Sequence, residues 1–400
     1  MFAEHEPRGG ALLAGAGPEA GVLIRDGLAA LAHRGSASWV GTDAGVQVGG
    51  TGRFAAGATG ANRVAAGWSA VGGVGVALAG GFVARDRHRN TFLAEGALLR
   101  SDGDAELLLH RIARSKQRTL VNRVVDALTD LDGGFAVAVC GEERMVVARD
   151  PRGIRPLYLG ERLDGAWACS ERGPLIELGV RTVREVGPGS LLVFDGRGPR
   201  EIQPFPKREV HACTIEAEVL VAPTEEGAWE AREALGAGLA ASSPCPDADL
   251  VLGLGEGAVA SGFARQSKLP LGGGLLLTPN GYAVASAAVR GRRVVLVLAY
   301  LPSATSARRW VTALHESGAA AVHLRVGFPA VVGNCRYGVD VEGLRLSEAV
   351  GPDRVAHWLG VASVGMGNAP ASGCQGCMVG RWPVSDEAAD QLPLFTAPTP

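Results

Sequence analysis

Two cysteines near the end of the sequence have the spacing of a chemical site. Cys374 and Cys377 lie in the stretch SGCQGCMVGRW, residues 372–382. Two thiols separated by two residues can form a redox pair, supply two ligands to a metal centre, or have no common role. Gly373 and Gly376 make a tight turn sterically easy at this place. The spacing alone leaves all three interpretations open.

Composition and cysteine count bound the class of protein. The chain has 400 residues, 47% of them hydrophobic and 20% charged, and a net charge of −2. The longest purely apolar run, residues 294–301, is far shorter than the roughly 20 residues that a membrane span needs. With no basic stripe and no signal-peptide pattern, we expect a cytoplasmic protein that binds neither nucleic acid nor membrane. Seven cysteines, an odd number, indicate reduced thiols or metal ligands instead of a disulfide framework.

Hydrophobic periodicity predicts the elements that must position these residues. In the first half, short apolar runs bounded by Gly, Pro, Asp or Arg are typical of strands, and helical spacing occurs among them. The expected strands are residues 133–140, 145–150, 155–160, 165–170 and 190–195, and the expected helices are residues 19–34, 104–115 and 120–131. Strands in a row with blocks of helices indicate an α+β fold in which helices cover sheet.

The second half alternates between helix and strand. The expected helices are residues 225–240, 257–267 and 304–318, and the expected strands are residues 248–255, 292–301 and 320–327. Continuous apolar strands in such an alternation predict a parallel sheet that is covered on both faces. The charged, Pro-punctuated stretch at residues 200–210 is the predicted domain boundary.

Four stretches of the first half share a common resemblance: GLAALAHRG (27–35), ARDPRGIRPLYLG (148–160), SERGPLIELG (170–179) and REVGPGSLLVFD (184–195). They resemble the glutaminase half of one enzyme family, the glutamine phosphoribosylpyrophosphate amidotransferases. Those similar to its phosphoribosyltransferase half include GRRVVLVLAY (291–300) and CRYGVDV (335–341). The matches cover nearly the whole chain in the family's order.

The resemblance implies a fold and an activity. It implies an α+β N-terminal-nucleophile hydrolase-like domain with αββα layers at residues 1–205. An α/β phosphoribosyltransferase-like domain with a parallel sheet would follow at residues 206–383, and a tail at residues 384–400. The family's enzyme takes ammonia from glutamine and uses it to displace pyrophosphate, in the first committed step of purine biosynthesis.

The glutaminase residues that the resemblance requires are missing. In the family, the mature chain begins with a cysteine that attacks the glutamine amide. The matching position here is Gly9, and no Cys, Ser or Thr precedes Ser36. The family's Asn-Gly oxyanion element is replaced by LAGG (78–81), with Ala79 at the position of the amide donor. We therefore expect no glutaminase activity by the family mechanism, because neither the nucleophile nor the donor is present.

The phosphoribosyltransferase loop is altered as well. Members of the family follow a buried strand with two acidic residues and a Thr-rich turn, which hold the ribose and its phosphate. Here Leu298 and Ala299 occupy the acidic positions, and Pro302 removes a backbone donor. Thr305 and Ser306 remain as a vestigial phosphate site, although the same residues are equally suited to capping the helix that begins there. We expect this site to be eroded and to have no role for Mg²⁺.

The cysteines, in contrast, match the resemblance. Some members of the family carry a [4Fe–4S] cluster, which is held by four cysteine thiolates. The positions that the family uses are filled here by Cys213, Cys335, Cys374 and Cys377. The same four ligands would suit zinc, so zinc stays open as an alternative, as do a redox pair and unrelated thiols. The other three cysteines are interpreted as structural thiols: Cys140, Cys169 and Cys245.

Two functions follow from this pattern. The first is a pseudoenzyme that keeps the family fold and its cluster and acts as a regulatory or partner protein. The second is an active or altered amidophosphoribosyltransferase that uses free ammonia or serves a specialised nucleotide pathway. Because the family tends to form oligomers, we expect a homo-oligomer or a hetero-oligomer with a catalytic relative.

Overall fold

The computed structural model describes residues 10–383 apart from short segments. The segments outside the description are residues 18, 33–36, 43–45, 49–53, 60–62, 71, 142–143, 196, 223, 255–256, 274, 279–280, 302–303, 330, 332, 340–351 and 370–371. The chain divides into two compact units. The amino-terminal unit comprises Gly9–Ala212, Arg336–Val339 and Arg381–Pro400, and the carboxy-terminal unit comprises Met1–Arg8, Cys213–Cys335 and Asp340–Gly380.

Two antiparallel sheets form the centre of the amino-terminal unit. The seven-stranded sheet has the order β11-β9-β10-β1-β4-β2-β3, and the six-stranded sheet has the order β13-β12-β8-β7-β6-β5. The first contains β1 (Leu12–Ala16), β2 (Ala37–Thr42), β3 (Val46–Val48), β4 (Phe54–Thr59), β9 (Tyr158–Arg162), β10 (Gly165–Cys169) and β11 (Thr182–Glu185). The second contains β5 (Val64–Ser69), β6 (Gly72–Phe82), β7 (Gly133–Cys140), β8 (Met145–Arg149), β12 (Leu191–Phe194) and β13 (Pro199–Ile202).

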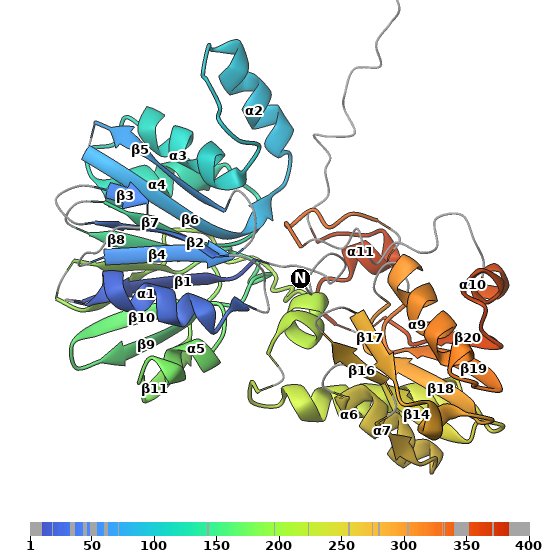
Figure 1. Ribbon diagram of the computed structural model, residues 1–400. Helices are drawn as coiled ribbons and strands as arrows, with labels where there is room; N and C mark the ends of the chain where they lie inside the picture. The colour runs from blue at the N-terminus through green and yellow to red at the C-terminus, as the bar shows by residue number, and fades with distance from the viewer. Residues whose placement is uncertain are drawn as a thin grey trace, which may run out of the picture. The chain divides into compact units, whose positions relative to one another are not determined.

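Side chains along each strand point alternately to the two faces of its sheet. The two sheets and the helices on their outer faces therefore form four layers. One face of each sheet contributes to a shared core that is rich in alanine, for example Ala14, Ala79 and Ala136. The opposite face of the first sheet packs under α1 (Ala20–Ala29) and α5 (Gly173–Glu177). That of the second packs under α3 (Asp104–Arg114) and α4 (Leu120–Thr129), and α2 (Arg85–Ala94) precedes them (Figure 1). The expected αββα arrangement is confirmed.

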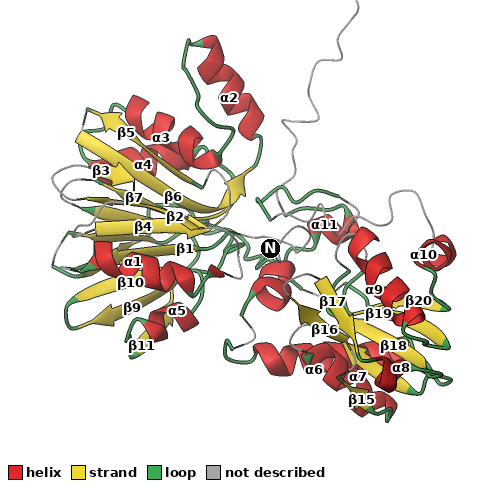
Figure 2. Ribbon diagram, viewed as in Figure 1, coloured by secondary structure: helices red, strands yellow, loops and turns green. Residues whose placement is uncertain are grey.

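A parallel sheet forms the centre of the carboxy-terminal unit. Its order is β15-β14-β18-β19-β20, and every neighbouring pair is parallel. The strands are β14 (Leu250–Gly253), β15 (Leu271–Gly272), β18 (Arg293–Leu298), β19 (Ala321–Val326) and β20 (Ser363–Met366). A separate hairpin joins β16 (Leu275–Thr278) to β17 (Gly281–Val284). Figure 2 shows the strands of this unit in yellow with helices around them.

Helices cover both faces of this sheet, because its strands are apolar on both sides. One face packs against α6 (Ala228–Ser242) and α7 (Ala258–Ser267). The other packs against α9 (Ala304–Glu316) and α10 (Pro352–Leu359), with α8 (Ser286–Val289) beside them. Two glycines allow α6 and α7 to cross closely, since a Cβ on Gly236 or Gly262 would lie 1.9 Å from a carbonyl oxygen of the other helix.

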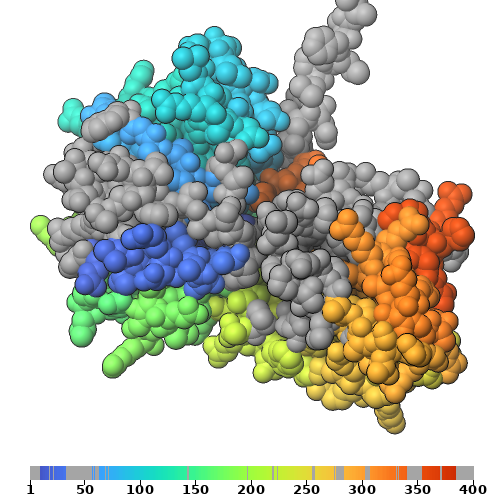
Figure 3. Space-filling model, in the orientation of Figure 1, coloured from blue at the N-terminus to red at the C-terminus, as the bar shows by residue number. Residues whose placement is uncertain are grey.

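Most predicted elements lie within a few residues of the observed ones, with two differences. The predicted boundary stretch at residues 200–210 begins inside β13, so its first residues belong to the six-stranded sheet. The change of unit falls later, between Ala212 and Cys213. Among the described residues, no helix is long and apolar enough to cross a membrane. Figure 3 shows the outer side of α1, in blue, at the surface of the molecule.

Candidate metal centre

Three segments of the carboxy-terminal unit bring four cysteines together. Cys213 and Cys374 face each other in an isolated parallel bridge, in which the N–H of Thr214 donates to the Cys374 carbonyl over 3.3 Å. Cys377 lies in the one-turn helix α11 (Gly376–Val379), and its carbonyl accepts the N–H of Gly333 over 3.2 Å, two residues before Cys335. The backbone therefore ties all three segments to one another.

The pKa values of these thiols depend on burial and on one another. Burial raises the pKa of Cys213 well above its usual value, and the neighbouring Cys335, Glu216 and Cys374 raise it further. Burial also raises the pKa of Cys377 to about 12, again with contributions from Cys335 and Cys374. Buried thiols that resist ionisation beside other thiols, as Cys213 and Cys377 do, are stabilised as thiolates when a cation offsets their charge. The cluster has the donor chemistry of a metal centre.

A backbone N–H group points at one of these sulfurs. The N–H of Glu216 donates to Cys213, at the start of the π-helical turn η2 (Glu216–Leu220). The N–H of Met378, next to Cys377, donates to the carbonyl of Gln375 over 2.8 Å. Hydrogen bonds to a sulfur stabilise the thiolate form, and around metal centres they tune the properties of the bound group. Gly373 has φ +85°, as the turn before Cys374 requires.

The residues expected at a glutaminase site carry no reactive group where the structure describes them. Gly9 lies outside the described residues. Gly10 is the first residue described, and its carbonyl accepts a hydrogen bond from Arg155. Ala79 is fully buried in β6, opposite Ala136 in the core between the two sheets. Its methyl group packs against apolar neighbours and donates no hydrogen bond.

One buried carboxylate in the same unit was not singled out by the sequence. Asp104, the first residue of α3, is buried, and its Oδ2 accepts the N–H of Phe82 over 3.1 Å. Its Oδ1 has no hydrogen-bond partner. Burial raises the pKa of Asp104, while that N–H and three arginines, among them Arg63 and Arg85, oppose the rise. A buried oxygen of this kind can accept a hydrogen bond from a small ligand.

Asp150 organises the turn that follows β8. It is completely buried and accepts N–H groups of four residues, over 3.3 Å from Phe135, 3.1 Å from Arg152, 2.9 Å from Ile154 and 3.0 Å from Arg155. Burial raises the pKa of its carboxyl to about 6, although these N–H groups oppose the rise. The role of Asp150 is therefore structural, because its oxygens are already occupied by backbone donors.

The phosphoribosyltransferase-like loop follows the central strand of the parallel sheet. Leu298, where the family has an acid, is buried at the end of β18, and its carbonyl accepts the N–H of Gly327. Ala299 follows it and accepts the N–H of Phe328. Pro302 lies outside the described residues. Thr305 and Ser306 fall in the first turn of α9, but their side chains also lie outside the description, so the vestigial phosphate site stays a prediction.

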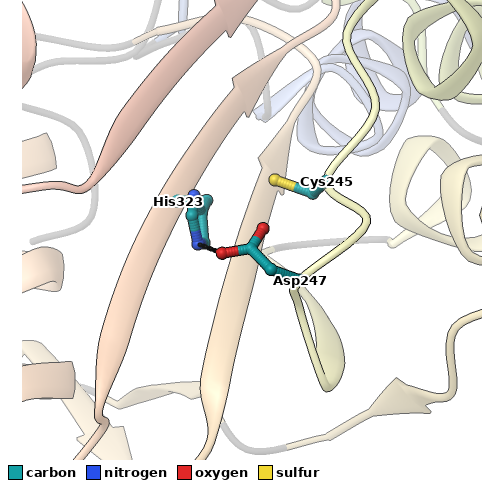
Figure 4. A group of neighbouring side chains, drawn as sticks. All are labelled: Cys245, Asp247 and His323. Carbon is teal, nitrogen blue, oxygen red and sulfur yellow. Dashed lines mark ion pairs between the residues drawn. The ribbon is translucent and has the colours of Figure 1, made fainter.

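A second group of ligand-type side chains lies in the carboxy-terminal unit, and the sequence did not predict it. Cys245, Asp247 and His323 each place one donor atom within 4.8 Å of the other two (Figure 4). Cys245 precedes β14 and His323 lies in β19, and no spacing rule joins residues so far apart. Only the short Cys-Pro-Asp stretch at residues 245–247 gave a local signal, and Cys245 was interpreted as structural.

Comparisons with known proteins agree with this geometry. Residues 68–177 match the glutamine amidotransferase domain family. Amidophosphoribosyltransferase 1 of Arabidopsis thaliana, a chloroplastic protein, is 30% identical over 351 residues, which are 78% of this chain and 62% of that protein. The amidophosphoribosyltransferase of Bacillus subtilis is also 30% identical, over 62% of this chain and 57% of that protein. In sequence, this chain is therefore similar to the amidophosphoribosyltransferases.

The fold of the family is shared along nearly the whole chain. The B. subtilis glutamine phosphoribosylpyrophosphate amidotransferase, solved with ADP and GMP, superposes with a TM-score of 0.85 at 23% identity. The superposition covers 94% of this chain and 97% of that one. The expected pairing of an N-terminal-nucleophile hydrolase-like fold with a phosphoribosyltransferase-like fold is confirmed. In sequence, the chain spans about three-fifths of the length of the curated amidophosphoribosyltransferases it matches first, 62% for the A. thaliana protein.

Proposed function

We propose that this chain is a member of the amidophosphoribosyltransferase family that holds a [4Fe–4S] cluster and serves as a non-catalytic regulatory or partner protein, related to the first step of purine biosynthesis. The observation that carries the proposal is the meeting of Cys213, Cys335, Cys374 and Cys377 in one unit. Four thiolates are the full ligand set of such a cluster. The residues expected to perform catalysis are, by contrast, inert wherever the structure describes them.

Zinc is the alternative occupant of the same four thiolates, and the spacing of the sulfurs distinguishes the two. Sulfurs around a tetrahedral zinc ion lie about 3.8 Å apart, because each Zn–S bond is about 2.3 Å long. A four-iron cluster is larger than one ion and holds its thiolates farther apart.

The chemistry that a [4Fe–4S] cluster supplies when it is bound is one-electron transfer and sensitivity to oxygen. Cys213, Cys335, Cys374 and Cys377 would hold it, and the N–H of Glu216 would stabilise the thiolate of Cys213. Free thiols persist best in a reducing compartment, which supports a cytoplasmic location. We expect the cluster to work as a structural or redox-sensing element that links three segments of the unit.

Loss of both catalytic sites supports a role through binding. Leu298 and Ala299 cannot coordinate a ribose hydroxyl or a metal ion, since their side chains carry no oxygen. Ala79 cannot stabilise an oxyanion, and Gly9 has no side chain to attack an amide. A protein with no reaction of its own would act by pairing with itself or with a catalytic amidophosphoribosyltransferase. We propose such an oligomer as its working form.

One observation favours the second function, an active or altered amidophosphoribosyltransferase. The buried Oδ1 of Asp104 has no hydrogen-bond partner within the chain, and buried oxygens of this kind are completed by water, an ion or a ligand. Retained binding of a small amine-bearing ligand in the amino-terminal unit would explain it. Binding alone does not restore catalysis, because the nucleophile and the acids of the loop would still be missing.

A pyrophosphate-release assay separates the two functions. The full-length protein, purified without oxygen, would be incubated with phosphoribosylpyrophosphate, Mg²⁺ and either glutamine or ammonium, with the B. subtilis amidophosphoribosyltransferase as the positive control. We expect pyrophosphate release at the rate of the enzyme-free blank with both nitrogen donors. Turnover with ammonium that is lost when Thr305 and Ser306 are both changed to alanine would overturn the non-catalytic assignment.

A further inference from the structure

The group of Cys245, Asp247 and His323 lies at the edge of the parallel sheet where its strands begin. Asp247 is three residues before β14, and His323 is the third residue of β19. In a parallel sheet these strand starts share one edge, whereas the loop after β18 lies at the other. The group is therefore separate from the phosphoribosyltransferase-like loop, and its thiol is not one of the four that form the cysteine cluster.

Hydrogen bonds around Ser363 fix the orientation of the imidazole. Ser363 Oγ accepts from Arg325 Nη1 over 3.0 Å and lies 2.9 Å from His323 Nδ1. It also lies close enough to Cys245 to oppose the rise in the pKa of that thiol. With Nδ1–H donating to the Ser363 hydroxyl, the free lone pair of the neutral imidazole lies on Nε2.

That lone pair points toward another acceptor. His323 Nε2 has no hydrogen-bond partner, and it lies 3.6 Å from Asp247 Oδ2, beyond hydrogen-bond reach. The side chain of His323 is only 8% exposed, so bulk water does not satisfy the nitrogen freely. Two acceptors that face each other at a buried position repel unless a proton or a metal ion lies between them. Figure 4 shows the thiol of Cys245 beside the same space.

We propose that Cys245, Asp247 and His323 form a binding site for a single zinc-type divalent ion. Ligand nitrogen and oxygen atoms around a tetrahedral zinc ion lie about 3.4 Å apart, because each bond is about 2.0–2.2 Å long, and the 3.6 Å between Nε2 and Oδ2 matches this value. A thiolate, an imidazole and a carboxylate are together a donor set that zinc accepts. Three protein ligands leave one position for water or a small ligand, on the side of the exposed Asp247.

The two arginines near the group have hydrogen-bond partners of their own, although the charge of Arg325 also acts on Cys245 and Asp247. The guanidinium of Arg325 donates to the carbonyls of Ser243 and Pro244, over 2.7 and 3.0 Å, and thereby anchors the backbone just before Cys245. Arg293 is paired with Asp249 over 3.0 Å. The thiolate and the carboxylate therefore contribute two negative charges to an ion whose charge is two positive. The hydrogen bond from His323 Nδ1 to Ser363 is the kind of outer contact that orients metal-binding imidazoles.

Cobalt(II) reports on this site, because it occupies zinc sites and gives a strong absorption band when bound to a thiolate. The full-length protein, purified without oxygen, would be titrated with Co²⁺, and bound zinc would be measured per chain after dialysis against Zn²⁺. We expect one equivalent of ion that depends on Cys245, and Cys245→Ser should abolish its thiolate band. His323→Gln and Asp247→Asn should each weaken binding at least 100-fold, and Ser363→Ala about 10–100-fold.

Two controls make the outcome decisive. His315→Gln alters a histidine in the same unit that bonds the Gly360 carbonyl, and it should leave Co²⁺ binding unchanged. Cys377→Ser should retain the equivalent that depends on Cys245, which separates this site from the four-cysteine cluster. Asp247 is exposed, so Asp247→Asn leaves the fold intact. Equal metal content in wild type, Cys245→Ser and Asp247→Asn would overturn the proposal.

Discussion

Replacing Cys377 with serine is expected to abolish the iron–sulfur cluster. Iron in protein purified without oxygen should fall from about four atoms per chain to fewer than about one, and the visible absorption of the cluster should disappear. Serine has nearly the size of cysteine, so α11 and the hydrogen bond from Gly333 to the carbonyl of residue 377 are kept. What is lost is the thiolate, which a buried hydroxyl cannot replace because it stays protonated.

A matched variant shows whether the effect is specific. Cys140→Ala removes another buried thiol, from β7 in the amino-terminal unit, where the surrounding residues are apolar. This variant should keep its full iron content and lose only some stability, because a small cavity replaces the sulfur. If Cys377→Ser retains iron as fully as Cys140→Ala does, then Cys377 is not a ligand.

Replacing Asp150 with alanine is expected to destabilise the amino-terminal unit by about 3–5 kcal/mol, because buried backbone donors lose their acceptor. Four N–H groups converge on this carboxylate, and three of them belong to buried residues, Phe135, Ile154 and Arg155. Hydrogen exchange of the β7 amides, followed by mass spectrometry, measures the change in that unit alone. Exchange should become about 1000-fold faster in the variant.

The pH dependence of the same unit provides an independent readout. Burial raises the pKa of Asp150 from 3.8 to about 6, so between these values the native state holds a proton that the unfolded chain releases. The native state binds more protons there, and stability should therefore fall as pH rises from about 4 to about 6. Asp150→Asn should lack this slope. Asp164→Ala, which removes an exposed carboxylate paired with Arg162, should shift stability by less than about 1 kcal/mol. An unchanged slope in Asp150→Asn would contradict the assignment.

The fold was predictable where one physical rule governed a segment. Continuous apolarity gave β7 at residues 133–140 to the residue, and it gave β18, observed at residues 293–298, as residues 292–301, because burial on both faces dictates the pattern. β13 was not predicted. It is a strand at the sheet edge with polar side chains and a proline at its start, and that pattern is also typical of a linker. The hairpin of β16 and β17 was hidden for a similar reason, because it lies in a Gly-rich stretch.

The cysteine cluster and the second group of ligands differ in how much sequence alone can say. Cys374 and Cys377 are close in the chain, and their role could be suspected from spacing. Cys245 and His323 meet only because β14 and β19 start at the same edge of one sheet, with β18 between them. No local pattern encodes that meeting, which depends on strand order. The unpartnered Nε2 of His323 appears only in three dimensions.

Iron and acid-labile sulfide in the wild-type protein, measured with zinc in the same oxygen-free sample, test the central claim most directly. The account predicts about four iron atoms and four sulfides per chain, a broad brown absorption, and a paramagnetic signal after reduction. The zinc site proposed at Cys245 adds at most about one zinc ion. A sample with no iron and no sulfide, whether or not zinc occupies the four thiols, would contradict it.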